Sequence, residues 1–574
     1  MGHDHRSHAH SHPHSHTHDA GAPLPPALDT TIEDGALTLG ELGRRQFLRS
    51  AGLLGAGAAA VGVLGSAGAG VAAADPGGRG PDHPPRGGYT WLAGDHHIHT
   101  QFSPDGQYRV IDQVRHASAY GLDWMVITDH GSDQHARIGV DKVNPAIVNA
   151  RTVTPDTLVF QGLEWNIPAA EHGTVFVHPG RGEVEVLKQF EIDYDGAGPG
   201  ATGARSASTP ANERLAVRGL HFLADSISSR RVRDALMFAN HPARKGIDSP
   251  HEIRGWRDAE PRIAVGMEGA PGHQAAGIPK SYGPGQGRGG YDNSPSAASF
   301  PGYPLESYRT FGGFDWMTAT VGGLWDSLLA EGKPWWISAN SDAHRIYGDT
   351  SIRGDQNFPT NGFYGDPVYS GAGPDIGNTD FWPGYYSRTH VGAEDFSYAA
   401  VMDGLRAGRT WVDHGGLLES LDVRLRAGNQ EVPLGGMLTA RRGTPVTLQI
   451  SITPAQVPNW SQFVPALASI DVIRGAVTGP VSGRDADVFT APNTRVVQSY
   501  DVRGRSGEIV LSYPLGRLDD GCYVRLRGSD GHRVGVGLRG GAVDPAGPVQ
   551  DIVGDADPWK DLWFYTNPMW ALPT

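Results

Sequence analysis

The chain has 574 residues, including 80 Gly, 42 Pro and a single Cys, and its 48 basic and 62 acidic side chains give a formal net charge of -14. This length exceeds one ordinary domain, and a hydrophobic content of 39% excludes a wholly disordered chain. The acidic balance argues against nucleic-acid binding through phosphate neutralisation, and the lone Cys522 leaves no intrachain disulfide to stabilise the fold.

The first segment, residues 1–43, is predicted to be disordered. It contains a run of His alternating with small or polar residues, from His3 to His18, and such a sequence cannot bury a core. The run either holds metal in the cytoplasm or is a solvated tail. We assign it no catalytic role, because the segment that follows it predicts its removal.

A twin-arginine export signal is predicted at residues 44–74. Arg44 and Arg45 precede an uncharged stretch rich in Gly and Ala, which ends in small residues suited to cleavage before Asp75. We expect cleavage there; a retained membrane anchor is the alternative, disfavoured because the stretch is weakly hydrophobic. The mature chain would begin with a linker at 75–88 and lie outside the cytoplasm, secreted or in the cell envelope, with the twin-arginine machinery as its export partner.

Residues 89–414 repeat a short apolar run, then a polar cluster, then a helix-like stretch. Buried strands followed by functional groups are typical of a parallel α/β barrel or barrel-like fold. Helices are predicted at 111–120 and 398–407. The apolar runs are Trp124-Met125-Val126-Ile127, Leu158-Val159-Phe160, Ala235-Leu236-Met237-Phe238, Ile263-Ala264-Val265 and Trp335-Trp336-Ile337.

Long interruptions within this region are predicted as loops at 180–208, 269–304 and 347–384, where Gly, Pro, Ser and Ala are frequent or aromatic residues gather. The third contains Tyr364, Phe381, Trp382, Tyr385 and Tyr386. These aromatic side chains either line a substrate pocket or pack on the barrel for stability.

Residues 415–574 change to alternating apolar and polar residues separated by Gly and Pro, which predicts an antiparallel β-sandwich-like domain. Cys522 falls within one of its strands and is interpreted as a small core residue. The closing segment 563–570 is expected to form a last strand or to pack on the barrel.

Two short motifs place metal-binding side chains on one strand face. His97-Ile98-His99 and Asp342-Ala343-His344 each separate their polar residues by two positions, so both side chains point the same way. Further imidazoles and a carboxylate stand at or just beyond other predicted strand ends, namely His130, Glu164, His172 and His241, and Asp105 follows His97 by eight residues. Such a convergence is costly without cations, and mixed imidazole and carboxylate ligands suit Zn, Mn or Fe better than Ca.

The order His97-x-His99-Thr100, Thr128-Asp129-His130, Gly162-x-Glu164, Asn240-His241-Pro242 and Ser341-Asp342-x-His344 resembles the PHP (polymerase and histidinol phosphatase) superfamily. The resemblance implies a distorted seven-stranded (β/α) barrel that holds up to three divalent metals. It places His97, His99, Glu164 and Asp342 on the first metal, and Asp105, His130 and His344 on the second. Glu164 would bridge, and His172 and His241 would hold the third.

Several neighbouring residues have open roles. His178 competes with His172 as the third-metal ligand, and we favour His172 because it precedes its strand. Asp129 and Glu268 either orient ligands or act in strand-end contacts. Arg244, Arg345 and Arg388 are suited to clamping a phosphate, with surface ion pairs as the alternative.

The predicted reaction is hydrolysis of a phosphomonoester or phosphodiester by attack of a metal-bound hydroxide. Asp342, His344, Glu164, Arg244 and Arg345 would carry it, on a small-molecule substrate that is an ester. No nucleophilic Ser elbow and no Gly-rich phosphate loop ending in Lys is present in the sequence. The alternatives are hydrolysis of a carboxyl ester, carbamate or amide at the same metals, and a secreted binding protein without catalysis.

Overall fold

The computed structural model describes residues 33, 36, 88–198, 208–280, 285–291, 294–481, 483–534, 546–554 and 556–574. The predicted His-rich region at 1–43, export signal at 44–74 and linker at 75–88 lie outside these residues, apart from 33, 36 and 88. Every helix and strand named below belongs to the unit Val71–Thr574. In the described part of the chain, no helix combines the length and apolar character needed to cross a membrane.

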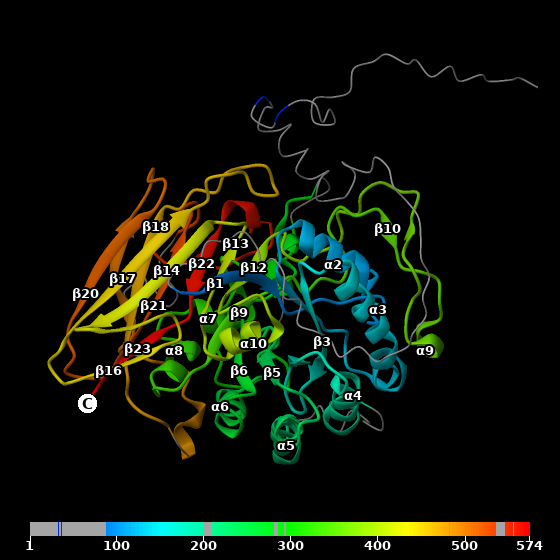
Figure 1. The fold of residues 1–574 in the computed structure, drawn as a ribbon, viewed down its shortest axis with the longest axis horizontal. Coiled ribbons are helices and arrows are strands. Elements are labelled where there is room, and N and C mark those ends of the chain that lie inside the picture. Colours follow the sequence, from blue (N-terminus) through cyan, green and yellow to red (C-terminus); the bar gives the residue numbers. More distant parts are fainter. Residues whose placement is uncertain are drawn as a thin grey trace, which may run out of the picture. The chain divides into compact units, whose positions relative to one another are not determined.

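The α/β region is built on a run of neighbouring strands in one large mixed sheet (Figure 1). Strands β1, β2 and β3 are parallel, β4 is antiparallel to both β3 and β5, and β5, β6 and β9 are again parallel. The strands are β1 (Thr90–Asp95), β2 (Trp124–Ile127), β3 (Leu158–Asn166), β4 (His172–Val177), β5 (Ala235–Ala239), β6 (Ala264–Ala270) and β9 (Trp336–Ala339). The predicted α/β class is therefore confirmed.

These strands lack polar alternation because both of their faces are covered. All residues of β2, β5 and β6 are buried, as expected for parallel strands flanked by helices. The helices line the outer side of the run (Figure 1). They are α2 (Val110–Ala119), α3 (Val140–Val153), α4 (Glu183–Tyr194), α5 (Pro210–Ser228) and α6 (Pro250–Ala259), with α10 (Tyr398–Arg406) packed near β12 (Ser387–Ala393).

The two ends of the strand run meet just beyond the ends of β1 and β9. Ile98 and Ala343 form a parallel bridge, and the His99 backbone N–H donates to the Ala343 carbonyl at 3.0 Å. Because these residues lie within the two short motifs, the bridge brings the His97-x-His99 and Asp342-x-His344 pairs together. The metal-binding candidates thus gather where the strand run returns on itself.

One predicted loop contains a helix. Residues 180–208 were expected to lack regular structure, but α4 occupies Glu183–Tyr194. Its Val186, Leu187 and Phe190 are fully buried at helical spacing, so the apolar face of this short segment outweighs the Gly-rich sequence around it. The second predicted loop contains the short 3-10 helices η3 (Gln274–Gly277) and η4 (Arg288–Gly290), and is followed by β7 (Thr310–Phe311), β8 (Phe314–Asp315) and α7 (Trp316–Ala319). The third contains β10 (Ser351–Ile352), α9 (Phe358–Asn361) and β11 (Val368–Tyr369).

The C-terminal residues form strands in two sheets, and their inner faces share a hydrophobic core that contains Cys522. One sheet has the order β15–β14–β17–β20, and its strands are antiparallel. Its strands are β14 (Leu418–Ala427), β15 (Gln430–Val432), β17 (Pro445–Pro454) and β20 (Ile509–Arg517). The others are β16 (Met437–Ala440), β18 (Ser469–Ala476), β19 (Arg495–Asp501), β21 (Cys522–Ser529), β22 (Trp563–Thr566) and β23 (Met569–Pro573).

The large sheet continues across the predicted boundary between 414 and 415. Strand β13 (Thr410–His414) pairs with β12 on one side and with β22 on the other, and β22 in turn pairs with β21. The closing segment therefore forms a pair of strands that joins the C-terminal sheets to the α/β region. The domain boundary between residues 414 and 415 stays a prediction. The sheet continues past it through the pairing of β13 with β22.

Candidate metal centre

The predicted ligands meet around Glu164, near the C-terminal end of β3. Its carboxylate is almost fully buried and faces imidazoles that come from several strand ends. The closest nitrogen–oxygen distances are 2.8 Å to His130, 3.0 Å to His172, 3.1 Å to His241, 3.2 Å to His97 and 3.5 Å to His99. Glu164 is thus placed where one carboxylate can be shared between neighbouring cations.

Asp342 forms the second anionic centre of the cluster. Its Oδ1 lies 3.1 Å from His97 Nε2, 3.2 Å from His99 Nε2 and 3.4 Å from His344 Nδ1. Asp342 adopts a left-handed backbone conformation with φ of 45°, which is costly for a residue other than Gly and is typical of functional sites. The turn aims this carboxylate at the imidazole pair from the other motif.

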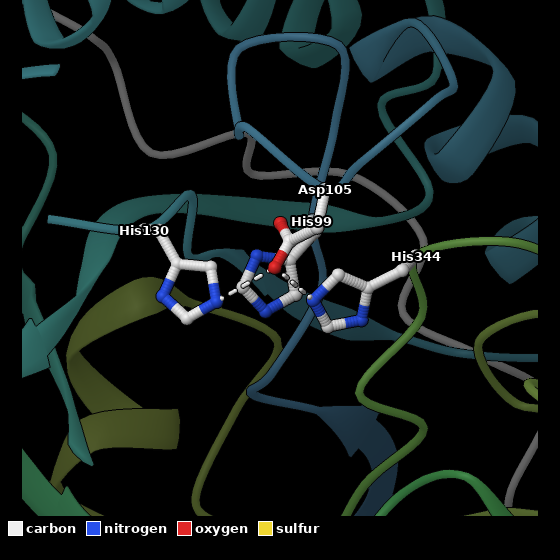
Figure 2. Close-up of side chains that lie close together, drawn as sticks. All are labelled: His99, Asp105, His130 and His344. Atoms are coloured by element: carbon white, nitrogen blue, oxygen red, sulfur yellow. Dashed lines mark ion pairs between the residues drawn. The ribbon is translucent and has the colours of Figure 1, made fainter. Parts of the chain in front are cut away.

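A third group lies at the rim, where Asp105 faces two imidazoles. Figure 2 shows its carboxylate between His130 and His344, with His99 behind it. Asp105 Oδ2 is 3.0 Å from His130 Nε2 and 3.3 Å from His344 Nε2. His99, Asp105, His130 and His344 each offer a ligand atom within 4.8 Å of the others.

His172 lies in the cluster and His178 lies outside it. His172 begins β4 and contributes to two potential ligand groups, one with His130 and Glu164 and one with Glu171 and His241. His178 follows the opposite end of β4, and its Nδ1 contacts the Pro179 carbonyl at 2.8 Å. A six-residue strand is roughly 20 Å long, so the geometry favours His172 as the ligand candidate.

Buried carboxylates hold the ligand-bearing backbone in place. Asp95, at the end of β1, accepts hydrogen bonds from the backbone N–H groups of His97 and Ser341, at 3.0 and 2.9 Å. Asp129 accepts from the backbone and the hydroxyl of Thr100. Asp129 therefore supports the loop that follows the first motif and touches no ring nitrogen of the cluster through a hydrogen bond among the described residues.

Glu268, on β6, links two ligand candidates directly. Its Oε1 lies 2.7 Å from His97 Nδ1, and its Oε2 accepts the His241 backbone N–H at 2.7 Å. A carboxylate bonded to one ring nitrogen of a His turns the other nitrogen toward a metal. Of the two roles open from the sequence, the geometry gives Glu268 the ligand-orienting one.

The charges of the cluster shift its pKa values strongly. Burial by itself raises the pKa of Glu164, but His130, His172 and His97 outweigh burial and hold it well below its usual value. Burial lowers the pKa of His130, yet the Glu164 and Asp105 carboxylates raise it well above the usual value. Where burial and other imidazoles dominate, the pKa of His99 falls to about 3. The neighbouring carboxylates thus favour the protonated form of His130, whereas burial disfavours the protonated form of His99.

The cluster combines the imidazole and carboxylate groups of a metal site with buried polar atoms that make no hydrogen bond within the described residues. Asp342 Oδ1 and His241 Nδ1 are buried and make no hydrogen bond within the described residues. The Nε2 atoms of His97 and His99 are 3.1 Å apart and both face the carboxylates. Buried polar atoms without hydrogen bonds are uncommon, and imidazole with carboxylate suits Zn, Mn or Fe.

The cluster forms the floor of a cavity of about 440 Å³ whose rim carries two guanidinium groups. Arg244 and Arg345 both line it. Arg244 lies 3.6 Å from Glu171, and its buried Nε makes no hydrogen bond within the described residues. Arg388 is elsewhere, because its side chain donates to the carbonyls of Gly384 and Tyr120. Two of the three candidate arginines therefore face the site.

Several residues at the site were missed in the sequence, among them Asp95 and Glu171, described above, and the pair His273 and Asp380. His273 follows β6, and Asp380 lies in the third predicted loop; both line the cavity. His273 Nε2 is 3.0 Å from Asp342 Oδ2, and its Nδ1 is 2.5 Å from Asp380 Oδ1. Both residues lie in segments without periodicity or a recognisable motif, so the sequence carried no signal for either beyond their residue types.

The aromatic residues of the third loop pack beside the site and do not line the cavity among the described residues. Trp382 stacks on His116 with a ring separation of 3.6 Å, and Phe381, Tyr385 and Tyr386 pack around Trp559. Of the two roles open from the sequence, these contacts favour packing for stability. The same loop presents Asp380 and its polar neighbours to the cavity.

Residues 95–228 match the PHP domain family. A two-domain protein from Bacteroides vulgatus ATCC 8482, containing a predicted PHP-like metal-dependent phosphoesterase, is 14% identical with a TM-score of 0.29, covering 83% of this chain and 98% of that one. A protein from Bifidobacterium adolescentis ATCC 15703, assigned as a metal-dependent phosphoesterase, is 16% identical with a TM-score of 0.18, covering 30% of this chain and 76% of that one. No curated protein matches the chain.

The family match spans the first part of the cluster. It includes His97, His99, Asp105, His130, Glu164 and His172, whereas His241, Asp342 and His344 lie beyond it. The later residues enter the same cluster through the contacts with Glu164 and the Ile98–Ala343 bridge. The segment that matches the PHP family model and the later residues His241, Asp342 and His344 thus build the site together.

Proposed function

We propose that the protein is a metal-dependent hydrolase of PHP type that cleaves phosphomonoesters or phosphodiesters. The observation that carries this proposal is the convergence of buried imidazoles on Glu164 and Asp342, beneath a cavity rimmed by Arg244 and Arg345. The fold we propose is a distorted barrel, supported by the strand run that closes through Ile98 and Ala343, followed by a β-sandwich-like domain, supported by the C-terminal sheets.

The ligand groups provide for up to three divalent cations. His97, His99, Glu164 and Asp342 would hold the first, and Asp105, His130 and His344 the second, with Glu164 bridging. His172 and His241 would hold the third, beside Glu171. Bound divalent metals in such a site supply a water of lowered pKa and neutralise charge on the phosphoryl oxygens.

The side chains of the chain bind and orient the substrate. Arg345 is exposed and lines the cavity, whereas Arg244 lines it beside Glu171 and has a buried Nε without a hydrogen bond among the described residues. Guanidinium groups bind phosphate oxygens in a planar, two-pronged geometry, and buried ones do so with little competition from water. The two arginines would hold the ester with its phosphorus above Glu164.

The test is hydrolysis of matched phosphomonoester, phosphodiester and carboxyl-ester substrates by the metal-loaded protein. A double variant, Asp342→Ala with His344→Ala, is the comparison, and its fold is checked by circular dichroism. We expect cleavage of a phosphoester that the double substitution abolishes. Cleavage confined to the carboxyl ester would instead establish the carbamate-type hydrolase, and no turnover by protein with full metal content would establish a binding protein.

We also propose export through the twin-arginine route, with removal of residues 1–74. The support is the Arg44-Arg45 pair and the uncharged stretch behind it. Sequencing the amino terminus of the protein recovered from the cell envelope or medium tests this, and Asp75 is the expected first residue. We expect the double variant Arg44→Lys with Arg45→Lys to stay in the cytoplasm. Secretion of that variant would contradict the proposed route.

A further inference from the structure

His273 and Asp380 reach the metal centre from two loops that supply none of the predicted ligands. His273 adopts a left-handed conformation with φ of 54°, three residues after the end of β6 at Ala270. Gly272, its neighbour, passes so close to the Asp342 turn that a Cβ at this position would lie 2.2 Å from Asp342 Cβ. The chain at 272–273 is therefore built tightly against the residue that His273 contacts.

The two oxygens of the Asp342 carboxylate face different partners. Oδ1 lies within 3.2 Å of the Nε2 atoms of His97 and His99, on the inner side of the cluster. Oδ2 lies 3.0 Å from His273 Nε2, on the outer side. A donor on Oδ2 prevents the carboxylate from rotating, so that Oδ1 is the oxygen presented to the imidazole pair.

Asp380 fixes the other side of the His273 ring. It is 1% exposed, and its Oδ1 lies 2.5 Å from His273 Nδ1. Its Oδ2 accepts the backbone N–H groups of His344 and Arg345, at 2.7 and 3.0 Å. One carboxylate thus holds both the His273 ring and the backbone that carries the His344 ligand and the rim arginine.

A direct ligand role for His273 fits the contacts less well. Its nearest potential co-ligands are Asp342 and His344. However, His344 Nδ1 lies 2.8 Å from the Asp342 main-chain carbonyl, to which it donates, and this turns its Nε2 toward Asp105. Of the atoms of Asp342 and His344, a cation bound to His273 would then find only Asp342 Oδ2 as a second ligand.

We propose that His273, clamped by Asp380, is a positioning residue that fixes the Asp342 carboxylate for metal binding. This inference rests on the proposed metal centre, but not on the identity of the ester that is cleaved. Hydrogen-bonded partners of metal ligands commonly change metal affinity by about 10- to 100-fold when removed.

The test measures metal binding by the full chain, with Mn²⁺ or Zn²⁺ titrated against a chelator, and the absorption of bound Co²⁺. The variants are His273→Ala, His273→Gln and Asp380→Asn. The control is His390→Gln, because His390 Nε2 lies 2.9 Å from Asp413 in a similarly buried pair remote from the cluster. Circular dichroism and thermal unfolding check that each variant is folded.

We expect His273→Ala to keep the metal stoichiometry at saturation, to weaken metal binding about 10- to 100-fold and to change the Co²⁺ spectrum. Asp380→Asn should weaken binding in the same direction, and His390→Gln should match the parent protein. Should His273→Ala not fold, His273→Gln carries the test, with weakened affinity again expected.

Three results would overturn the inference. Unchanged affinity and spectrum in the folded His273 variants would show that the ring does not position Asp342. Loss of one metal equivalent at saturation would make His273 a direct ligand. A parent protein that binds no metal would refute both this inference and the proposed function, whereas one that binds metal without cleaving phosphoesters would refute the proposed reaction alone.

Discussion

Buried carboxylates in two regions of this protein are neutralised in opposite ways. At the candidate metal centre, Glu164 and Asp342 face imidazoles. Where the α/β region meets the C-terminal sheets, Asp326 on α8 (Leu324–Leu329) is paired with Arg525 on β21 through two contacts of 2.9 and 2.8 Å. Both pairs of groups are buried, so the difference lies in the chemistry of the cationic partner.

A guanidinium keeps its charge at every physiological pH, whereas an imidazole does so conditionally. The Asp326–Arg525 pair is therefore complete without any further ion, and Tyr523 adds a hydrogen bond to the same carboxylate at 3.1 Å. The Glu164 cluster becomes electrically complete either by protonating its His residues or by binding cations. The carboxylate paired with arginine thus has a permanent cationic partner, whereas the carboxylate paired with histidines has partners that can exchange their protons for a metal ion.

The largest effect that separates the regions is expected from Glu164→Gln. The neutral amide keeps the size of the side chain but removes the shared anionic ligand, so metal content should fall and phosphoester hydrolysis should drop by about 10³-fold or more. Atomic absorption and steady-state kinetics measure the two quantities. Glu268 is not a suitable control, since it orients His97, but Glu185→Gln is, because the Glu185 side chain is exposed and pairs with Arg231 at the surface; it should leave both quantities unchanged.

The reverse pattern is expected from Asp326→Ala. Arg525 would be left buried without its partner, which costs about 3–5 kcal/mol of unfolding free energy. Urea unfolding measures this, and the metal content of the folded fraction should stay that of the parent. Asp501→Ala removes an exposed partner of Arg503 and should change stability by less than about 1 kcal/mol. Equal losses in the two variants would contradict the structural role of the buried pair.

A smaller effect is expected from Arg345→Ala at the cavity rim. Losing one guanidinium that contacts the developing charge should lower kcat/KM for the phosphoester by about 10²-fold. Metal content and the Co²⁺ spectrum should be unaffected, because this side chain lies outside the ligand groups. A fall in metal content would mean that the rim and the ligand cluster are not separable.

The smallest expected effect is a pH dependence of stability with opposite sign in the metal-free and metal-loaded proteins. The raised pKa of His130 contributes stability that is complete below its ordinary value of 6.5 and is lost as pH rises through the raised value. The lowered pKa of Glu164 contributes stability that is present above its ordinary value of 4.5 and is lost as pH falls through the lowered one.

The thermal midpoint of the metal-free protein should therefore decline as pH rises above 6.5. With metal bound, the midpoint should rise over the same interval, because cations bind the neutral imidazole and displace its proton. Differential scanning calorimetry with and without chelator compares the two. Parallel pH profiles in both states would show that the His set does not exchange protons for metal.

The sequence predicted those parts of the structure that repeat or carry spaced motifs. Buried strands such as β2 and β5, and the alternating β17, follow from periodicity, and the His97-x-His99 spacing predicted a shared face. Helix α4 was missed because its apolar face spans three turns inside a Gly-rich segment. His273 and Asp380 were missed because their positions depend on where two loops fold, which leaves no local pattern.

The proposed function depends on cations being bound at Glu164. The most direct measurement is the anomalous X-ray diffraction of crystals of the Mn²⁺- or Zn²⁺-loaded protein. We predict anomalous peaks about 2.0–2.2 Å from the Glu164 and Asp342 oxygens, with His97, His99, His130 and His344 as neighbours. Peaks confined to surface residues, or none around Glu164, would contradict the metal centre and the function proposed from it.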